Sequence, residues 1–289
     1  MIGQRNLQSR IEQLIKDRTF PRFSILVGPK GSGKKTLAHE IGHMFNAWRV
    51  HSDYVDVYRL PDVKIDTVRE IITQAYKKIT TMIYIIPDAD NMSNAAKNAL
   101  LKVTEEPPNE AYFIMTLEDE NNTLETIRSR GTVFHMNNYT REEILDYCGD
   151  KHFNADDEDY VKKENIIKEL CETPGEVDML WESNPIEFYN YVQLVVDNIA
   201  EVSLANAFKI SSKVALKEDA EGYDLRLFWK AFFKITIEKA YNYRDAEDVS
   251  AYGEAALATS KCMQKLRVKG INRSMLMDTW VLEIRSCLK

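Results

Sequence analysis

The chain has 289 residues, of which 44% are hydrophobic and 29% are charged. This length predicts two or three domains, and this composition excludes disorder along the whole chain and fibrous repeats. Lys and Arg number 38 against 45 Asp and Glu, which gives a net charge of −7. An acidic excess of this size argues against a protein that wraps nucleic acid by itself.

Targeting signals and cysteine pairs are both missing from the pattern. No stretch approaches the ~20 uninterrupted apolar residues that span a bilayer, and the first residues lack the apolar core of a signal peptide. The four cysteines, Cys148, Cys171, Cys262 and Cys287, form no C-x₂-C pair. We therefore expect a cytoplasmic protein with reduced thiols, no disulfide framework and no zinc or other metal-ligand set.

Short apolar runs alternate with helical patterns over the first half of the chain. The predicted strands cover residues 23–27, 54–60, 82–86, 112–116 and 132–136. The predicted helices cover 35–45, 66–79 and 93–105, with Asp66 and Ser93 as N-caps. This alternation predicts an α/β fold with a parallel sheet that is buried on both faces.

Only helices are predicted beyond residue 136. Thr140 and Glu143 form a capping box that opens a helix to about Cys148. Further helices are predicted at 160–171, after Thr173-Pro174, and from 185 to 289, with breaks near 219–221, 243–245 and 270–271. The organisation is an α/β domain at 1–138, a small helical unit at 139–183 and a helical C-terminal domain at 184–289.

A glycine-rich turn stands between the first predicted strand and the helix that follows it. It matches G-x-x-x-x-G-K, whose backbone N–H groups cradle phosphates while its lysine, here Lys34, reaches the β- and γ-phosphates. The next position binds Mg²⁺ through a Ser or Thr hydroxyl in this motif, but here it is Lys35. Thr36 lies ~100° further round the helix and does not replace that hydroxyl. The candidate nucleotide-binding residues are Gly28, Pro29, Lys30, Gly31, Ser32, Gly33, Lys34, Lys35 and Thr36.

The second nucleotide motif is also altered. Pro87 stands where an Asp usually binds Mg²⁺, and Asp88 stands where a Glu usually polarises the attacking water. Proline cannot engage a metal, and Asp88 is one methylene short. In the alternative interpretation, Asp88 and Asp90 are turn and cap carboxylates. The two altered motifs predict weak binding of ATP or ADP at most and argue against bound Mg²⁺.

Several segments together resemble one family, the AAA+ clamp-loader subunits. Residues 85–108 (IIPDADNMSNAAKNALLKVTEEPP) are similar to its second nucleotide motif and the following helix, and NALLKVTEEPP is especially specific. Residues 124–131 (LETIRSRG) resemble its Ser-Arg-Cys motif, with Gly131 in place of the cysteine. Further similarities lie at His51-Ser52-Asp53 and Val68–Ile71, and weaker ones at Thr173–Gly175 and Asn272–Arg285.

The resemblance implies a RecA-like nucleotide domain, a helical lid and an all-α collar. It also implies partners: other subunits in a hetero-pentamer that opens a sliding clamp and places it on primed DNA. In this family the Arg of Ser-Arg-Cys, here Arg130, acts as an arginine finger on nucleotide bound by the neighbouring subunit. The helix after Ser93 lies where such subunits track the DNA backbone, and its candidate contacts are Asn94, Lys97, Asn98 and Lys102.

Where the chain departs from the family, it resembles one subunit group. Lys35 and Pro87 remove metal ligands, Glu176 stands where motor subunits carry a lid Arg, and Leu117-Glu118 where a small polar sensor is usual. These changes beside a retained Arg130 resemble the bacterial DNA polymerase III delta-prime subunit, without its zinc module. The expected role is a stator that lacks ATPase activity and lends an arginine. The alternatives are an active gamma- or tau-like motor subunit and a scaffold that binds no nucleotide.

Overall fold

The structure is a computed structural model, and the positions it describes are residues 2–48, 50, 54–78, 80–108, 111–215, 222–243, 245–266 and 270–289. Contacts divide the chain into two compact units. Unit 1 comprises Met1–Glu143 and Thr173–Gly175, and unit 2 comprises Ile144–Glu172 and Glu176–Lys289. The predicted similarity at His51–Asp53 lies outside the described residues.

Unit 1 is built on a parallel sheet with the strand order β2-β3-β4-β1-β5. Its strands are β1 (Phe23–Val27), β2 (Asp56–Arg59), β3 (Met82–Ile86), β4 (Ala111–Leu117) and β5 (Thr132–His135). Every residue of β1, β3 and β4 is buried, as expected for strands covered on both faces. The predicted fold class is therefore confirmed.

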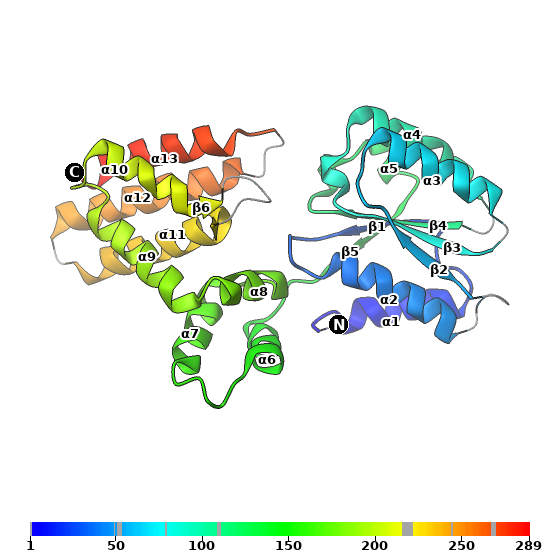
Figure 1. Cartoon of the computed structure of the whole chain (residues 1–289), viewed down its shortest axis with the longest axis horizontal. Helices are drawn as coiled ribbons and strands as arrows, with labels where there is room; N and C mark the ends of the chain where they lie inside the picture. The colour runs from blue at the N-terminus through cyan, green and yellow to red at the C-terminus, as the bar shows by residue number, and fades with distance from the viewer. Residues whose placement is uncertain are drawn as a thin grey trace. The chain divides into compact units, whose positions relative to one another are not determined.

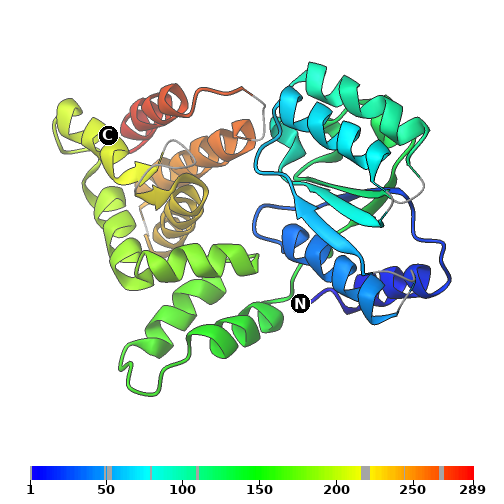
Figure 2. The ribbon, with the colours of Figure 1, turned by 45° about the vertical axis from the view of Figure 1, so that its right-hand side comes forward.

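Helices cover both faces of this sheet (Figures 1 and 2). On one face lie α1 (Arg5–Lys16) and α2 (Lys34–Ala47); on the other lie α3 (Ile65–Lys77), α4 (Asn94–Glu105) and α5 (Glu125–Arg128). Each face of the sheet has its own hydrophobic core. Along β3, Ile83 and Ile85 belong to the core beneath α1 and α2, while Tyr84 and Ile86 belong to the core beneath α3, α4 and α5. The period of two in a strand thus divides one apolar run between two cores.

Two predicted caps are confirmed. The Ser93 side chain accepts a hydrogen bond from the Ala96 N–H at 3.2 Å at the start of α4. At the start of α6 (Arg141–His152), Glu143 N–H donates to Thr140 Oγ1 at 3.2 Å, and Thr140 N–H donates to Glu143 Oε2 at 2.8 Å. This reciprocal pair is a capping box.

The predicted cap at Asp66 is wrong. Helix α3 begins one residue earlier, at Ile65, and Asp66 lies in its first turn. Asp62 binds the polar groups there instead, because its Oδ1 accepts from Lys64 N–H at 3.0 Å and from Thr67 Oγ1 at 2.6 Å. An acidic residue two places before the N-cap Lys64 thus accepts hydrogen bonds at this helix start.

Unit 2 is mainly helical. Its helices are α6, α7 (Tyr160–Leu170), α8 (Pro174–Glu182), α9 (Pro185–Asn198), α10 (Leu204–Phe208), α11 (Leu225–Asn242), α12 (Ala246–Lys265) and α13 (Arg273–Cys287). Short 3₁₀ turns occupy Ala89–Asn91 and Glu120–Asn122 in unit 1 and Lys209–Lys213 in unit 2. None of the helices in the described residues is long and apolar enough to cross a membrane.

One part of the helical prediction is wrong. A parallel two-stranded sheet, β6 (Val214–Ala215) with β7 (Tyr223–Asp224), precedes α11. Strands of two residues are too short to show an alternating pattern in the sequence. The breaks near 243–245 and 270–271 do separate α11, α12 and α13, while 219–221 lies outside the described residues. Because α7 packs on α9 and α11, the division of the helical part at residue 184 stays a prediction.

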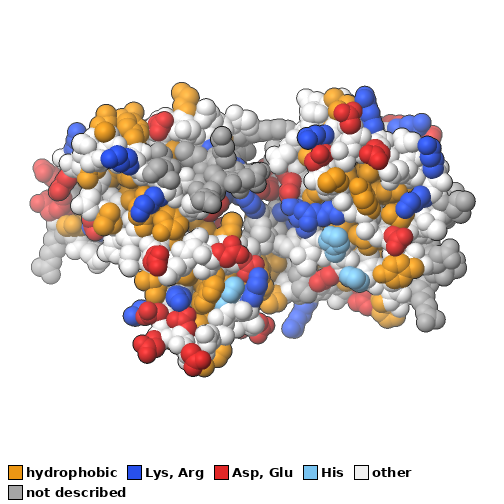
Figure 3. All heavy atoms as spheres, viewed as in Figure 1, with side chains coloured by type: hydrophobic (Ala, Val, Ile, Leu, Met, Phe, Trp, Pro, Cys, Tyr) orange, Lys and Arg blue, Asp and Glu red, His pale blue; other side chains and the backbone are white. Residues whose placement is uncertain are grey.

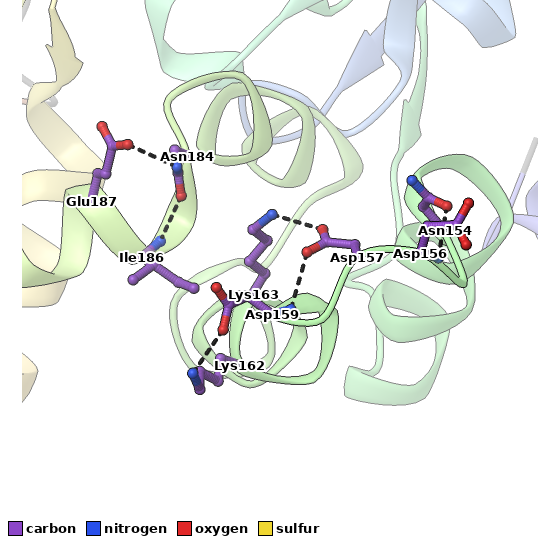
Figure 4. Close-up of polar contacts among 9 residues, drawn as sticks. All are labelled: Asn154, Asp156, Asp157, Asp159, Lys162, Lys163, Asn184, Ile186 and Glu187. Atoms are coloured by element: carbon purple, nitrogen blue, oxygen red, sulfur yellow. Dashed lines mark hydrogen bonds and ion pairs between the residues drawn. The ribbon is translucent and has the colours of Figure 1, made fainter.

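Two carboxylates of the acidic loop between α6 and α7 are paired with lysines of α7 (Figure 4). Asp157 accepts from the Lys163 ammonium at 2.7 Å, which lowers the pKa of that carboxyl, and Asp159 accepts from Lys162 at 2.7 Å. Among the described residues, no group of three or more His, Cys, Asp or Glu side chains could hold a metal ion. The two ion pairs join the loop to the start of α7.

Aromatic residues of α11 and α13 form the centre of unit 2. Trp280 is fully buried, lies edge-on to Phe232 at a centroid distance of 4.8 Å, and donates from Nε1 to Thr259 Oγ1 at 3.0 Å. Its neighbours Phe228 and Trp229 are also fully buried. Large aromatic side chains in such a position contribute most of the apolar area that a helical domain buries.

Replacing Trp280 tests this centre. We expect Trp280→Ala to lower the free energy of unfolding by about 3–5 kcal/mol, because it leaves a cavity and removes the hydrogen bond that the indole donates to Thr259 Oγ1. Urea unfolding followed by far-UV circular dichroism measures the change. The control is Leu282→Ala on the same helix, where the side chain is 51% exposed and the change should be small. Equal effects for the two variants would contradict the assignment.

Candidate functional site

The polar residues of unit 1 gather where strands β3, β4 and β1 end. Gly28 follows β1, Pro87 and Asp88 follow β3, and Glu118 follows β4. Because these strands are neighbours and parallel, their carboxyl ends lie at one edge of the sheet. The Gly28 N–H donates to the Leu117 carbonyl at 3.1 Å, which joins the two loops directly.

The glycine-rich loop has the backbone shape that its sequence requires. Gly31 and Gly33 have φ of +80° and +83°, a region that favours glycine, and Gly33 precedes α2. The Ser32 side chain is fully buried, and its Oγ has no hydrogen-bond partner among the described residues. A buried hydroxyl without a hydrogen-bond partner is unfavourable, so a ligand that forms a hydrogen bond with Ser32 Oγ would stabilise the loop. The loop fits a phosphate group.

Lys34 is turned inward. Its ammonium donates to the Gly28 carbonyl at 2.6 Å and to the Pro29 carbonyl at 2.7 Å, and the side chain is 7% exposed. Burial lowers the pKa of Lys34 to about 8, although the carboxylates of Glu118, Asp90 and Asp88 oppose that shift. The Lys34 ammonium is thus bound to carbonyls of its own loop. It would have to give up these hydrogen bonds to bind a phosphate.

Lys35 and Asp88 form an ion pair across the site. Asp88 has a left-handed backbone with φ of 48°, and its N–H donates to Thr116 Oγ1 at 3.0 Å. Such a conformation is uncommon outside glycine, so the surrounding contacts hold it in place. The carboxylate that remained at the second nucleotide motif is therefore engaged by the lysine that replaced the hydroxyl.

The residues present do not fit Mg²⁺. Oxygen ligands are what this ion requires, and Lys35 and Pro87 offer none. Asp88 is paired with Lys35, and Thr36 is exposed on the next position of the helix. Asp90 is also engaged, because its carboxylate accepts from Glu118 N–H at 2.8 Å and from Asn122 Nδ2 at 3.0 Å. The interpretation of Asp90 as a structural carboxylate agrees with these bonds.

The segment Thr173–Gly175 packs on the phosphate loop within unit 1. Gly175 N–H donates to the Gly31 carbonyl at 3.1 Å, and Thr173 Oγ1 donates to the Lys30 carbonyl at 3.2 Å. A Cβ on Gly175 would lie 2.5 Å from Gly31 Cα, so neither position has room for a side chain. Tyr139 donates to the Ser32 carbonyl at 2.9 Å.

Glu176 takes part in a cluster of unit 2. Lys230 on α11 pairs with Glu176 at 2.8 Å and with Glu172 at 3.0 Å, and these carboxylates raise the pKa of Lys230 against the lowering effect of burial. Glu176 Oε2 also accepts from Glu172 N–H at 2.7 Å. The position where an arginine was expected in a motor subunit thus carries a carboxylate that is used structurally.

Arg130 lies at the surface just before β5. Its guanidinium donates to the Thr126 carbonyl at 2.7 Å and pairs with Glu105 at 2.8 Å. The side chains of Arg130 and Glu105 are 36% and 53% exposed, so solvent screens the pair. Arg128, two residues earlier, has a different partner and donates to Asn121 Oδ1 at 3.3 Å.

Three of the four candidate DNA contacts are exposed. Asn94, Asn98 and Lys102 lie on the outer side of α4. The prediction for Lys97 is wrong for this structure, because the side chain is 3% exposed and its ammonium donates to the Asn122 carbonyl. Figure 3 shows basic and acidic side chains interspersed over the face in view, in keeping with the net charge of −7.

Several contributing residues were missed at the sequence level. Thr116, a buried small polar residue inside β4, accepts a hydrogen bond from the Asp88 N–H, whereas the resemblance indicates Leu117-Glu118 as the sensor region. Glu105 belongs to NALLKVTEEPP, yet its pairing with Arg130 was not foreseen. The hydroxyl inside an otherwise apolar strand was the signal for Thr116, since buried hydroxyls need partners.

The lowered pKa of Lys34 predicts how stability depends on pH. Between pH 8 and 10.5 the unfolded chain holds this proton while the folded chain releases it, so the contribution of Lys34 to stability rises with pH. We expect the unfolding free energy of wild type minus that of Lys34→Met to increase by roughly 3 kcal/mol across this window. Urea titrations at several pH values measure it, and a constant difference would contradict the buried position of Lys34.

Comparisons with known proteins agree with the motifs. Residues 49–140 match the protein family described as DNA polymerase III, delta subunit. The chain is 22% identical to a replication factor C small subunit of Aeropyrum pernix over 208 residues, 70% of this chain and 62% of that protein. It is 26% identical to DNA polymerase III subunit gamma of Buchnera aphidicola over 169 residues, 51% of this chain and 47% of that protein.

A solved structure of a DNA polymerase III gamma subunit-related protein from Thermotoga maritima covers 98% of this chain and 100% of its own, with 17% identity and a TM-score of 0.49, too weak a likeness to bear on function. The sequence matches span less than two thirds of the length of either relative. The family match and the relatives confirm the predicted resemblance to AAA+ clamp-loader subunits, and a delta-prime-like subunit is compatible with both.

Proposed function

We propose that this chain is a clamp-loader subunit of DNA replication that does not hydrolyse nucleotide itself and donates Arg130 to nucleotide held by a neighbouring subunit. Its partners in this proposal are other loader subunits, a sliding clamp and primed DNA, in the cytoplasm. The names of its relatives, replication factor C and DNA polymerase III subunits, support the complex. The altered pocket supports the division of labour.

The ion pair between Lys35 and Asp88 carries the proposal. Hydrolysis in phosphate-loop proteins depends on a metal ion that bridges the β- and γ-phosphates and on a group that orients the attacking water. In this chain the ligand position is cationic, and the remaining acid is neutralised by it. Losing a positioned catalytic group commonly costs ~10²–10⁴ in rate, so the combined losses leave negligible turnover.

The surroundings of Arg130 support its role as a donor. An exposed ion pair such as Arg130–Glu105 contributes at most about 1 kcal/mol, so a phosphate of a neighbouring subunit can compete for the guanidinium. An arginine supplied in trans accelerates phosphoryl transfer by ~10³–10⁵. The guanidinium is therefore retained where it is accessible, while the cationic group expected at Glu176 is absent and its carboxylate is bound to Lys230.

Contacts with DNA belong to the assembly. Asn94, Asn98 and Lys102 are exposed on one helix and offer amide and ammonium donors to phosphate oxygens. Such contacts position a protein on the backbone and carry no sequence information. A single lysine gives little affinity, so binding to duplex requires several subunits together.

The purified chain tests the catalytic part of the proposal. We expect no ATP hydrolysis above background with Mg²⁺ present, because the metal ligands are absent, and Lys34→Ala should not change this result. Phosphate release measures it. Turnover that disappears in Lys34→Ala would instead favour an active motor subunit.

A reconstituted loader tests the arginine. We expect Arg130→Ala to slow single-turnover ATP hydrolysis at the neighbouring site by ~10³ or more, because the transition-state cation is lost. Arg128→Ala is the matched control, since it removes an arginine two residues away that is bound to Asn121. Unchanged hydrolysis in Arg130→Ala, with the complex still assembled by size-exclusion chromatography, would rule out the donor role.

A further inference from the structure

Two consecutive lysines begin helix α2, and they face different partners. Lys34 donates to the carbonyls of Gly28 and Pro29 inside the loop. Lys35 pairs with Asp88 at the mouth of the site, with 37% of its side chain exposed. One ammonium is thus bound within the loop, and the other belongs to the residue that replaces the metal-binding hydroxyl of an unaltered phosphate loop.

Two features of the glycine-rich loop, Gly28–Lys34, favour the binding of a ligand. The buried Ser32 Oγ has no hydrogen-bond partner among the described residues, and α2 has 14 residues with its N-terminus at this loop. Aligned N–H groups at a helix start attract anions, and a buried hydroxyl next to them can donate to a phosphate oxygen. These two observations are independent, and both point to an anion.

The charges around the cradle decide what accompanies that anion. A divalent cation beside the Lys35 ammonium would be repelled, whereas the ammonium itself can bind phosphate oxygens through short, charge-assisted hydrogen bonds. The acidic side is also limited, because Asp88, Asp90 and Glu118 all lie close enough to act on Lys34. A third phosphate would bring one more negative charge towards these three carboxylates, so a diphosphate suits the site better than a triphosphate.

We infer that the loop binds the phosphates of a nucleoside diphosphate without a metal ion, with the Lys35 ammonium in the place of Mg²⁺. The inference rests on the proposed function, which treats the same loop as a phosphate site that does not hydrolyse. Binding releases Lys35 from Asp88 and turns it to the phosphate, so the lysine exchanges one anionic partner for another. The loop then binds metal-free phosphate groups, and Mg²⁺ in solution competes with the loop for those groups.

Calorimetric titration of the full chain with ADP, in EDTA and in excess Mg²⁺, tests this directly. We expect binding in EDTA to be at least as tight as in Mg²⁺, because the metal-free form is the ligand. Inorganic pyrophosphate in EDTA should bind to the same loop and compete with ADP. Binding that is tenfold or more tighter in Mg²⁺, or no binding in EDTA up to millimolar ADP, would overturn the inference.

Two variants separate the role of Lys35 from general charge. Lys35→Thr restores the hydroxyl of the motif and should weaken binding in EDTA about tenfold, with Mg²⁺ now improving the affinity. Lys30→Thr removes a lysine from the same loop, away from the metal position, and should weaken binding equally in both buffers. Wild-type affinity of Lys35→Thr in EDTA would overturn the assignment, provided that its circular dichroism spectrum matches that of wild type.

The outcomes are separable from those of the proposed function. If ADP binding required Mg²⁺, the inference of a metal-free site would be overturned. The proposed donation of Arg130 would be unaffected, because it is tested separately in the reconstituted loader. ATP hydrolysis by the purified chain would overturn the proposed function, whatever the titrations with ADP show.

Discussion

A parallel sheet that is buried on both faces confines polar chemistry to the ends of its strands. In unit 1 the interior strands β1, β3 and β4 are wholly buried, so Gly28, Asp88 and Glu118 can lie only where those strands stop. Because the strands are parallel and adjacent, these ends share one edge. The proposals for the site depend on this edge of the sheet, where Lys35 on α2 pairs with Asp88 after β3.

Much of this was predictable because it depends on local patterns. Apolar runs bounded by turns mark buried strands, and a glycine loop between a strand and a helix marks a phosphate cradle. Ser93 and the pair Thr140 and Glu143 mark helix starts for a reason contained in a few consecutive residues. Each of these features needs only neighbours in the chain. The strands and the helix starts lie where they were predicted, and the phosphate cradle stays a prediction.

The remaining features depend on contacts between distant segments. Lys35 and Asp88 are 53 residues apart, and their separate departures from the motif give no sign that the two side chains meet. Lys97 was predicted to be exposed, because a lysine on an amphipathic helix is usually solvated. Here it is buried, and its ammonium donates to the Asn122 carbonyl. Only the placement of the turn at Glu120–Asn122 against α4 explains it.

The bond between Arg130 and Glu105 also affects how the complex would respond to salt. A guanidinium that leaves a carboxylate of its own chain for a phosphate of another subunit breaks one ion pair for each that it forms. The number of ion pairs is then conserved, and screening by dissolved ions weakens the free and assembled forms alike. Ionic strength would therefore act only weakly on an exchange of this kind.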